Sequence, residues 1–415
     1  MTTQRVVITG LGAVSALGLG ANTNFEQALA GQSGIDTFTL SFPRPITPNV
    51  AAQIRFPLPE LIKKSEQSMF DRFSLLGWIA AQEALQQSGI SSDSSELENS
   101  GVFWGTGMGG ASTLEAGYVD MFIGQKDRIR PLSIVASMNN SAAAQIALKC
   151  GFGGTVNTYS SACVSSAQAI GEAYRHIRHG YANRILAGGS EALLTFGVIS
   201  AWDSMHALAK PNHDHPEQSC RPFALNRSGL VLGEAGAAVM LESLASAQER
   251  GATILAELVG YGASNDATHM TNPNSAGQAR AMQKAISDAG LALSEISYIN
   301  AHGAGTPAGD QAESDSIKLV FGEHAKRLMV SSTKAVHGHN LGAAAALEFI
   351  LTVKTLLSKA VPPTAFLDQA DPKCDLDYVP LVARHNQNIS AAMSNSFAFG
   401  GINAALIVKE FLPHP

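Results

Sequence analysis

The 415-residue chain predicts a layered α/β fold, in which helices cover sheets. Short apolar, β-rich runs alternate with helical patterns along the whole sequence, as they do in chains built from βα units. Hydrophobic residues make up 45% of the chain and charged residues only 15%, which indicates a large buried core rather than disorder. Length alone leaves open whether the chain is one large body, two domains or two fused halves.

Six apolar runs are the expected strands. In chain order they are Val6–Thr9, Gly101–Gly105, Thr155–Tyr159, Arg184–Ala187, Ile296–Ala301 and Leu328–Ser331. A helical pattern follows Cys163 and ends at Gly180, and a second one runs from Leu341 to Ser358. A strand, a loop and an alanine-rich helix occur in this order around Cys163 and again around His339, so we expect the two halves of the chain to be related.

The first strand carries glycines that are typical of a dinucleotide site, but the pattern is incomplete. Gly10-Leu-Gly12-Ala-Val-Ser15 lacks the third glycine of G-x-G-x-x-G. The next helix is expected to begin only at Thr23-Asn-Phe-Glu26, which has the spacing of a capping box. Without a helix N-terminus on the glycines a pyrophosphate has no cradle, so a dehydrogenase is disfavoured. A Walker P-loop is also absent from the sequence.

Cys163 is the strongest candidate for a nucleophile. It lies in Ser160-Ser-Ala-Cys163-Val-Ser-Ser166, where the run that ends at Tyr159 changes into a helical pattern. At the start of a helix, free N–H groups and the positive end of the dipole favour a thiolate over a thiol. Most free cysteines are instead small, buried apolar residues, so Cys163 needs partners elsewhere in the chain to count as catalytic.

Two histidine motifs supply such partners. They are Asn300-Ala-His302-Gly-Ala-Gly-Thr-Pro-Ala-Gly-Asp310 and Ser332-Thr-Lys334-Ala-Val-His337-Gly-His339-Asn-Leu-Gly-Ala343. Each follows an expected strand, and α/β sheets place their sites at strand ends. One such histidine alone is more often a hydrogen-bonded structural residue. One cysteine and two histidines on three equivalent loops, with glycines that let a substrate approach the backbone, indicate an active site.

The other histidines and cysteines do not indicate a metal site. His213-Asp-His215 lies in a proline-flanked polar loop, and His176 and His179 share a helix face that lacks a third ligand and suits the helix dipole. No paired spacing and no C-x-x-C occurs among the four cysteines, Cys150, Cys163, Cys220 and Cys374. We therefore expect no disulfide framework, no catalytic metal and a reducing, cytoplasmic setting.

With these motifs in this order, the chain resembles a β-ketoacyl-[acyl carrier protein] synthase of the type that elongates fatty-acid or polyketide chains. The segments that also carry the resemblance are Val6-Val-Ile-Thr-Gly-Leu-Gly12, Asn226-Arg-Ser-Gly-Leu-Val-Leu-Gly-Glu-Ala-Gly236, His269-Met-Thr271 and Asn395-Ser-Phe-Ala-Phe-Gly-Gly-Ile-Asn403. It implies a thiolase-like, layered α-β-α-β-α fold of two related halves. Residues 1–250 would carry the nucleophile and residues 251–415 the two histidines.

The resemblance implies a decarboxylative condensation in two stages. Cys163 takes an acyl group from the phosphopantetheine arm of an acyl carrier protein, while the backbone N–H groups of Cys163 and Phe399 hold the oxyanion. Malonyl carrier protein then loses carbon dioxide, and His302 and His339 donate hydrogen bonds to the enolate. Attack of the enolate on the acyl group yields a 3-keto chain that is two carbons longer. No cofactor is implied, because both substrates arrive on the carrier protein.

Supporting residues of the family match further positions. Lys334 matches the active-site lysine, which we expect to pair with Glu348 and to lie close to Asp310, because a buried lysine needs such partners. Thr306 would donate a hydrogen bond to the pantetheine, and Phe399 would gate the site. The alternative roles are a surface position for Lys334 and plain core packing for Phe399.

The acyl chain is expected to lie beside Met108 and Trp202. Met108 matches the position that gates the acyl tunnel, where a flexible side chain moves aside more readily than a β-branched one. Core filling is the alternative role. The sequence departs from the family pattern at Ala304, Ile402 and Val336-His337. These departures favour an enzyme outside housekeeping fatty-acid synthesis, such as one in a polyketide or aryl-polyene pathway.

Carrier proteins are generally acidic, so docking needs a basic patch that the net charge of −6 does not reveal. The candidate docking residues are Lys63, Lys64, Arg72, Lys126, Arg128 and Arg130. A solvated surface is the alternative role of each. The family implies a homodimer, with a heterodimer that contains a chain-length-factor-like subunit as the alternative. No nucleic-acid partner is expected.

No membrane span is expected. The chain starts with a polar segment rather than an apolar signal, and its longest apolar stretch, 341–357, is broken by Glu348 and Lys354.

Two other classes of protein share part of this pattern. A subunit of the chain-length-factor kind is a non-catalytic partner that ordinarily lacks the nucleophile, and the presence of Cys163 argues against it. A coenzyme A thiolase or a cysteine hydrolase would share the thiol chemistry. A thiolase is expected to have a second catalytic cysteine in a glycine-rich loop near the C-terminus, and Cys374 lies in no such loop.

Overall fold

The computed structural model describes residues 3–40, 42, 49–60, 62–91 and 95–412. The strands are β1 (Val6–Ser15), β2 (Gly18–Leu19), β3 (Asp36–Thr37), β4 (Val50–Ala51), β5 (Gly101–Gly105), β6 (Val156–Tyr159), β7 (Arg184–Glu191), β8 (Ala235–Ser243), β9 (Ala256–Asn265), β10 (Ile296–Asn300), β11 (Met329–Ser331), β12 (Ala391–Ala398) and β13 (Ile402–Lys409). The helices are α1 (Ala21–Leu29), α2 (Arg72–Ser88), α3 (Ala111–Phe122), α4 (Ser133–Ser137), α5 (Ser141–Cys150), α6 (Ser165–Arg178), α7 (Phe196–Ser204), α8 (Leu244–Glu249), α9 (Ser275–Ala289), α10 (Pro307–Phe321), α11 (Lys334–His337) and α12 (Ala344–Ser358).

The main sheet repeats one strand pattern on its two sides. Its order is β11-β10-β12-β13-β9-β1-β8-β7-β5-β6, and β1 meets β9 in the middle. In the N-terminal half, β6, β5 and β7 run parallel, whereas β8 and β1 follow as antiparallel neighbours. In the C-terminal half, β11, β10 and β12 run parallel, whereas β13 and β9 follow as antiparallel neighbours. The expected relation between the two halves is therefore visible in the topology.

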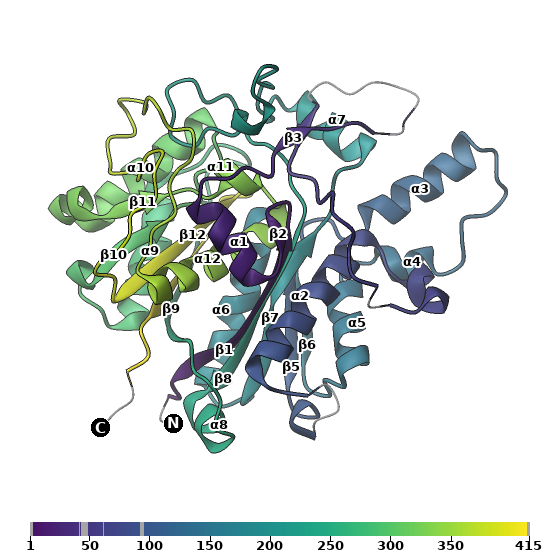
Figure 1. Cartoon of the computed structure of the whole chain (residues 1–415), viewed down its shortest axis with the longest axis horizontal. Coiled ribbons are helices and arrows are strands. Elements are labelled where there is room, and N and C mark those ends of the chain that lie inside the picture. The colour runs from purple at the N-terminus through teal and green to yellow at the C-terminus, as the bar shows by residue number, and fades with distance from the viewer. Residues whose placement is uncertain (1–2, 41, 43–48, 61, 92–94, 413–415) are drawn as a thin grey trace.

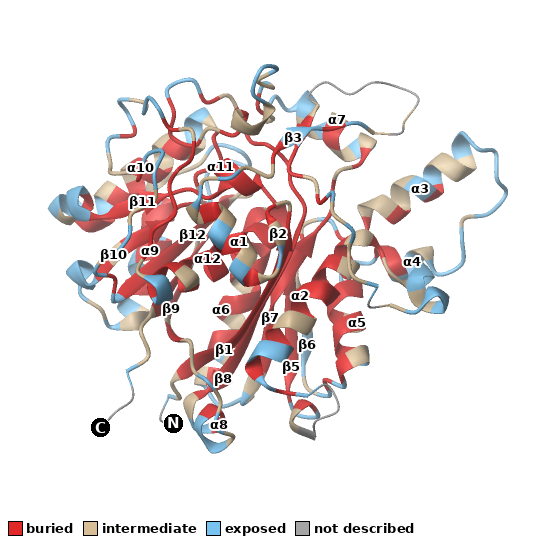
Figure 2. Ribbon diagram, in the orientation of Figure 1, coloured by how far each residue is buried: buried red, intermediate tan, exposed pale blue. Residues whose placement is uncertain are grey.

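Helices form three layers around the two halves of this sheet (Figure 1). α2 and α5 cover the outer face of the N-terminal half, and α9, with α10 beside it, covers the outer face of the C-terminal half. Between the halves lie α6 and α12, each of which packs on strands of both. Buried residues concentrate in the strands and in this middle layer (Figure 2). The predicted layered α-β-α-β-α fold is confirmed.

The glycines of the first strand serve packing rather than phosphate binding. A Cβ at Gly10 would lie 2.0 Å from the carbonyl oxygen of Ala84, and one at Gly12 would lie 2.0 Å from that of Ala80. Both carbonyls belong to α2, so only glycine lets this helix lie so close to β1. The strand continues through both glycines to Ser15. No helix therefore starts on them.

The helix that follows begins earlier than the sequence predicted. α1 starts at Ala21, with Gly20 as its N-cap, so the capping box predicted at Thr23 and Glu26 is wrong. Those two residues lie inside the helix. Glu83 of α2 does the capping from a distance, because its carboxylate accepts the N–H groups of Ala21 and Ala13, each at 2.8 Å.

The longest apolar stretch is a core helix. Leu341–Ser358 is apolar and long enough to cross a membrane by composition, but 83% of it is buried within the protein. Its first turn, Leu341–Ala343, is a 3-10 turn (η7) and the remainder is α12. This stretch is the middle-layer helix of the fold.

Candidate active site

Cys163 lies in a tight turn between β6 and α6. The turn is a 3-10 turn, η3 (Ala162–Val164), and Ala162 has a φ of 51°, a left-handed conformation that non-glycine residues rarely adopt. The Cys163 side chain is only 6% exposed. Burial raises the pKa of its thiol to about 12, which outweighs the lowering effect of the Lys334 ammonium. The expected preference for thiolate at the helix start is therefore not met in this structure.

His339 points its ring at this sulfur. Its Nε2 lies 3.1 Å from Cys163 Sγ, and its Nδ1 accepts the N–H of Leu341 at 3.2 Å. Because Nδ1 is an acceptor, the proton of the neutral ring is assigned to Nε2. Burial and the Lys334 ammonium lower the pKa of His339 well below its usual range. The imidazole is therefore a neutral hydrogen-bond donor directed into the site.

The N-terminal half holds the backbone of His339 in place. The His339 N–H donates to the carbonyl of Val231 at 2.6 Å, and its carbonyl accepts the N–H of Gly233 at 3.0 Å. A Cβ at Gly233 would lie 2.8 Å from the backbone carbonyl oxygen of His337, so glycine is required there. Two hydrogen bonds between the halves thus fix the position of this ring beside Cys163.

His302 completes the group. Its ring meets that of His339 edge to face, with 5.3 Å between centroids. Glu313 of α10 accepts the N–H groups of His302 and Gly303 at 2.9 and 2.8 Å. Burial, then the charge of Lys334, lowers the pKa of His302 well below its usual range. Two neutral imidazoles therefore lie against each other in the cavity that Cys163 also lines, and that of His339 points at the thiol.

Lys334 and Glu348 form a fully buried ion pair behind the histidines. Lys334 Nζ also donates to the carbonyl oxygen of His302 at 2.6 Å, so the pair is tied directly to the site. Asp310 is not part of this ion pair and has partners of its own. It accepts the N–H groups of Phe223 and Gly305 at 2.7 and 3.1 Å. Its ion-pair partner is Arg227, with Nε and Oδ2 3.7 Å apart.

The thiol of Cys163 and the two histidine rings line one cavity of about 430 Å³, which is in the usual size range of small-molecule sites. The predicted site residues that line it are Cys163, Trp202, His302, Thr306, His339 and Phe399. Trp202 and Phe399 stack across it, with 5.6 Å between ring centroids and 23° between planes. Within the described residues the structure gives the N–H of Phe399 no hydrogen-bond partner, so this donor is available to a ligand.

Met108 lies outside the wall of this cavity. Its side chain is 50% exposed, and it is not among the residues that line the cavity in this single chain. Its loop is held by Glu191, whose carboxylate accepts the N–H groups of Met108 at 3.3 Å and of Gly342 at 3.0 Å. Gly342 follows His339, so Glu191 joins the Met108 loop to the histidine loop.

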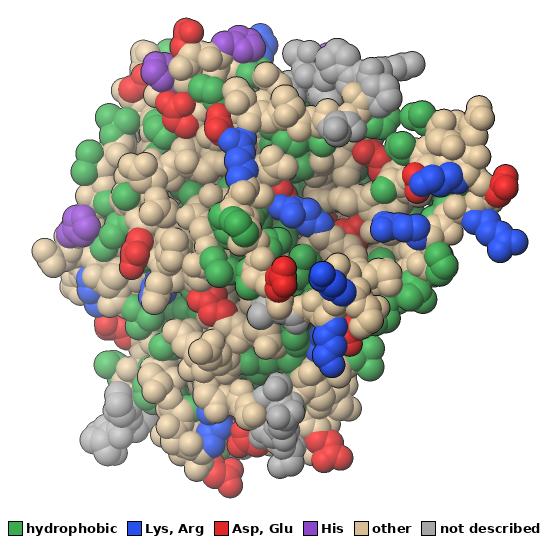
Figure 3. All heavy atoms as spheres, turned by 45° about the vertical axis from the view of Figure 1, so that its right-hand side comes forward, with side chains coloured by type: hydrophobic (Ala, Val, Ile, Leu, Met, Phe, Trp, Pro, Cys, Tyr) green, Lys and Arg blue, Asp and Glu red, His purple; other side chains and the backbone are tan. Residues whose placement is uncertain are grey.

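The candidate docking residues lie on the surface near a projecting segment. Lys63, Lys64, Arg128 and Arg130 are exposed. Figure 3 shows Lys and Arg side chains that extend from the middle of this face onto the projection formed by α3 and α4. Two of the candidates are engaged within the chain, since Arg72 pairs with Glu234 and Lys126 with Asp120.

Sequence reasoning gave no role to three buried residues that support the site. Glu313 and Glu191 each accept two or more backbone N–H groups, and burial raises the pKa of each carboxyl to about 7. The signal available for these two glutamates was a carboxylate in a helix or strand whose other residues are expected to be buried. His337 is the third, and its ring contacts Asn340 Oδ1 at 2.9 Å and Thr333 Oγ1 at 3.0 Å. Across the described ranges, no group of three or more His, Cys, Asp or Glu residues is placed to hold a metal ion.

Comparison with known proteins identifies the family. Residues 3–247 match the β-ketoacyl synthase N-terminal domain, and residues 255–368 match the C-terminal domain. Nodulation protein E of Rhizobium sp. (strain N33) is 40% identical over 408 residues, which cover 98% of this chain and 99% of that protein. The 3-oxoacyl-[acyl-carrier-protein] synthase 2 of Staphylococcus aureus (strain COL) is 39% identical over 411 residues, with 98% and 99% covered.

Solved structures agree. The type II polyketide synthase complex AntDE:AntF, an acyl-carrier protein with its ketosynthase bound to the hexaketide, contains a chain with a TM-score of 0.90 and 32% identity. The match covers 99% of this chain and 100% of that one. Matches to both domain families and to relatives of equal length lead to one conclusion. The chain belongs to the β-ketoacyl synthase family of acyltransferases.

Proposed function

We propose that this β-ketoacyl synthase forms an acyl-enzyme on Cys163 and condenses it with a malonyl group carried on acyl carrier protein. The observation that carries the proposal is the meeting of one thiol with two neutral imidazoles in a single cavity. In the first stage Cys163 sulfur attacks the thioester carbonyl. The bond between that carbonyl and the pantetheine sulfur breaks, and the carrier thiol leaves with the proton.

The second stage needs hydrogen-bond donors rather than a base. Loss of carbon dioxide from malonyl carrier protein leaves its electron pair on an enolate, whose oxygen accepts hydrogen bonds from His302 and His339. The enolate carbon attacks the acyl carbonyl, the bond to Cys163 breaks, and the Cys163 sulfur takes up a proton from solvent. Two imidazoles that remain neutral at neutral pH suit this role. Each can donate a hydrogen bond to the enolate oxygen without transferring its proton to the enolate.

The remaining residues support these stages. Lys334 and Glu348 fix the His302 backbone, and Asp310 fixes the loop that carries it. The N–H groups of Cys163 and Phe399 form the oxyanion hole. Thr306 takes the pantetheine where α10 begins, and Phe399 gates the entrance.

The acyl chain extends past Trp202 toward Met108 in this proposal. Trp202 lines the cavity, and the exposed Met108 would join its wall where a second chain covers this face. We place the boundary between the two halves after residue 250, so that residues 1–250 and 251–415 each carry one copy of the repeated strand pattern.

A homodimer is supported by the open edge of the sheet at β6. This strand pairs only with β5 within the described residues, and Val156 on it is 40% exposed. Large apolar side chains of α3 and α4 in the same half are also exposed, including Phe122 at 76% and Ile134 at 67%. A second copy would cover both features, since an unprotected edge invites pairing. A chain-length-factor-like subunit is the alternative occupant.

Acyl carrier protein is the partner, and its phosphopantetheine arm delivers both substrates without a further cofactor. The exposed Lys63, Lys64, Arg128 and Arg130 offer the positive charge that an acidic carrier needs. The structure with a TM-score of 0.90 is itself a ketosynthase in complex with its acyl-carrier protein. We place the enzyme in the cytoplasm. The relatives include both a nodulation protein and a 3-oxoacyl-[acyl-carrier-protein] synthase 2. For the product of this enzyme we propose a polyketide or another specialised pathway.

Intact mass spectrometry tests the function. The protein is mixed with acyl carrier protein loaded with an acyl group, and malonyl carrier protein is then added. The expected result is an acyl adduct on Cys163 that disappears as a 3-keto carrier product forms. No adduct and no product would favour the non-catalytic partner subunit. Acyl transfer from coenzyme A thioesters, with no reaction of carrier-bound substrates, would favour a thiolase.

A further inference from the structure

Helix α7 is held at its N-terminus by a carboxylate from another helix. Glu115 of α3 accepts the N–H of Phe196 at 2.8 Å through Oε1 and the N–H of Gly197 at 2.6 Å through Oε2. The N-cap residue of α7, Thr195, makes no capping hydrogen bond, and its buried hydroxyl has no partner within the described residues. Glu115 therefore supplies the cap that the helix itself lacks.

The fit around this carboxylate is close. A Cβ at Gly197 would lie 2.9 Å from Glu115 Oε2, so a side chain there would push the carboxylate away. α3 is itself anchored two residues earlier, where buried Asp71 accepts the N–H of Thr113 at 2.7 Å and its hydroxyl at 2.6 Å. Glu115 thus stands on a fixed part of α3, although the rest of that helix projects from the body (Figure 1).

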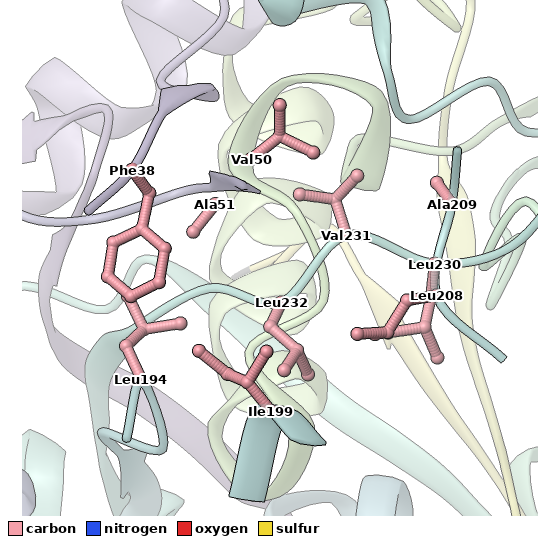
Figure 4. A pocket seen from close by; sticks show the side chains of 10 residues that line it. All are labelled: Phe38, Val50, Ala51, Leu194, Ile199, Leu208, Ala209, Leu230, Val231 and Leu232. Atoms are coloured by element: carbon pink, nitrogen blue, oxygen red, sulfur yellow. The ribbon is translucent and has the colours of Figure 1, made fainter. Parts of the chain in front are cut away.

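α7 forms part of the wall of two cavities. Trp202, near its end, lines the catalytic cavity and stacks on Phe399. Ile199, one turn earlier, lines a small apolar cavity, where Figure 4 shows it beside Leu232. Leu230 lines both cavities. The position of α7 therefore sets the shape of the space next to Cys163.

We infer that Glu115 is a positioning residue for acyl-chain selection. By holding the first turn of α7, it fixes Trp202 against Phe399 and keeps Ile199 in the apolar cavity, and so limits the length of acyl chain that fits beside Cys163. The inference rests on the proposed function, because it takes the occupant of the catalytic cavity to be an acyl chain. Loss of the cap frees α7 to move outward, which enlarges the space for a longer chain.

Glu83 provides a matched control. Its carboxylate also accepts two backbone N–H groups, those of Ala21 and Ala13, and also caps the N-terminus of a helix, α1. Glu83 lines neither cavity, and no residue of α1 does. Glu83→Ala therefore removes comparable hydrogen bonds without touching α7.

The first readout needs no substrate. Trp202 is one of three tryptophans, and the other two, Trp78 and Trp104, are buried. Acrylamide quenching of tryptophan fluorescence, with the matching Trp202→Phe protein as the baseline in each background, isolates the Trp202 signal. Quenching of Trp202 is expected to rise in Glu115→Ala and to stay at the wild-type level in Glu83→Ala. Glu115→Gln, which keeps one acceptor oxygen, is expected to lie between wild type and Glu115→Ala.

The second readout is the rate at which carrier-bound acyl groups of short and long chain acylate Cys163. Glu115→Ala is expected to raise the ratio of long-chain to short-chain rates by about tenfold, the size that one methylene is worth in an apolar pocket. Partial return of this ratio in Glu115→Gln is expected. Unchanged quenching and an unchanged ratio in a folded Glu115→Ala protein would overturn the inference, as would equal changes in Glu83→Ala. Failure of wild type to accept any acyl group would instead overturn the proposed function and leave the quenching result to decide the role of Glu115.

Discussion

The strands β6 and β11 occupy equivalent places in the two halves, yet their surroundings are opposite. β6 leads to Cys163, and its residues are exposed or half-buried, with no strand on the outer edge within the described residues. β11 leads to Lys334 and His339, and every residue from 328 to 353 is buried. The chain itself covers the β11 edge, where the N–H of Val330 donates to the carbonyl of Asp377 at 2.8 Å.

The two loops also resemble each other in detail. Each contains a 3-10 turn that starts a middle-layer helix, and each has a left-handed non-glycine residue, Ala162 with φ 51° and Leu341 with φ 44°. One topology has therefore been put to two uses. The N-terminal loop presents a nucleophile at a face that a second chain would cover, and the C-terminal loop holds a buried network of charge and imidazoles. Substitutions in the N-terminal loop should therefore affect catalytic activity alone. Substitutions in the C-terminal loop should also lower the free energy of unfolding.

Cys163→Ala is expected to have the largest effect on activity. Condensation and acyl labelling should both be lost, because the nucleophile is gone. The free energy of unfolding should change by no more than about 1 kcal/mol, since little volume is removed. Product formation and denaturant unfolding are measured on the same preparation. An acylated Cys163→Ala protein would show that the nucleophile lies elsewhere.

Lys334→Ala is expected to be the most destabilising of these changes. It leaves Glu348 as an unpaired buried carboxylate, a loss that typically costs about 3–5 kcal/mol. The control is Lys359→Ala, which breaks a partly exposed pair with Glu410 and should cost at most about 1 kcal/mol. Both lysines also donate to a backbone carbonyl. Similar losses in the two variants on denaturant unfolding would refute the difference between a buried and an exposed network.

His337→Asn is expected to change how stability depends on pH. Burial lowers the pKa of His337 from about 6.5 to about 3. As pH falls below about 6.5, His337 is therefore protonated in the unfolded chain but stays neutral in the folded chain. Between pH 6.5 and 5 this one residue should therefore cost wild type about 2 kcal/mol of stability. Asparagine keeps a donor for Asn340 and has no proton to gain. Parallel stability curves for the two proteins over this range would exclude His337 as the cause.

Met108→Phe should have the smallest effect and tests the N-terminal half near its open edge. Because Met108 is half exposed, the free energy of unfolding should change by no more than about 0.5 kcal/mol. Added bulk at the proposed gate should shift preference toward shorter acyl chains by about tenfold or less, while acetyl transfer survives. The measurement is a competition between short and long acyl carrier substrates. An unchanged preference would remove Met108 from the pocket.

The sequence predicted the layered fold and the cysteine and histidine loops because each is a local pattern. In this pattern a strand ends, a loop of small residues follows and a helix begins. The pattern occurs in all three loops, around Cys163, His302 and His339. The structure adds what comes from distant residues. Glu83 caps α1 and Glu115 caps α7 across 62 and 81 residues of sequence, and Glu313 holds the His302 loop from the following helix.

The same reason explains two predictions that failed. The capping box at Thr23 and Glu26 was a sound local pattern, but a carboxylate from α2 caps the helix instead and lets it start at Ala21. The thiolate preference of Cys163 followed from the start of α6, but burial of the thiol in the folded chain raises its pKa. Strands β8 and β9, rich in alanine and glycine, carry too weak a β pattern to be placed from the sequence.

The division of labour between the two loops can be measured directly. Transfer of an acyl group to residue 163 and release of carbon dioxide from malonyl carrier protein are followed side by side in wild type, Cys163→Ala, His302→Ala and His339→Ala. The account predicts that Cys163→Ala loses acyl transfer and keeps decarboxylation, whereas both histidine variants keep acyl transfer better than decarboxylation. Equal loss of the two half-reactions in each variant would contradict it.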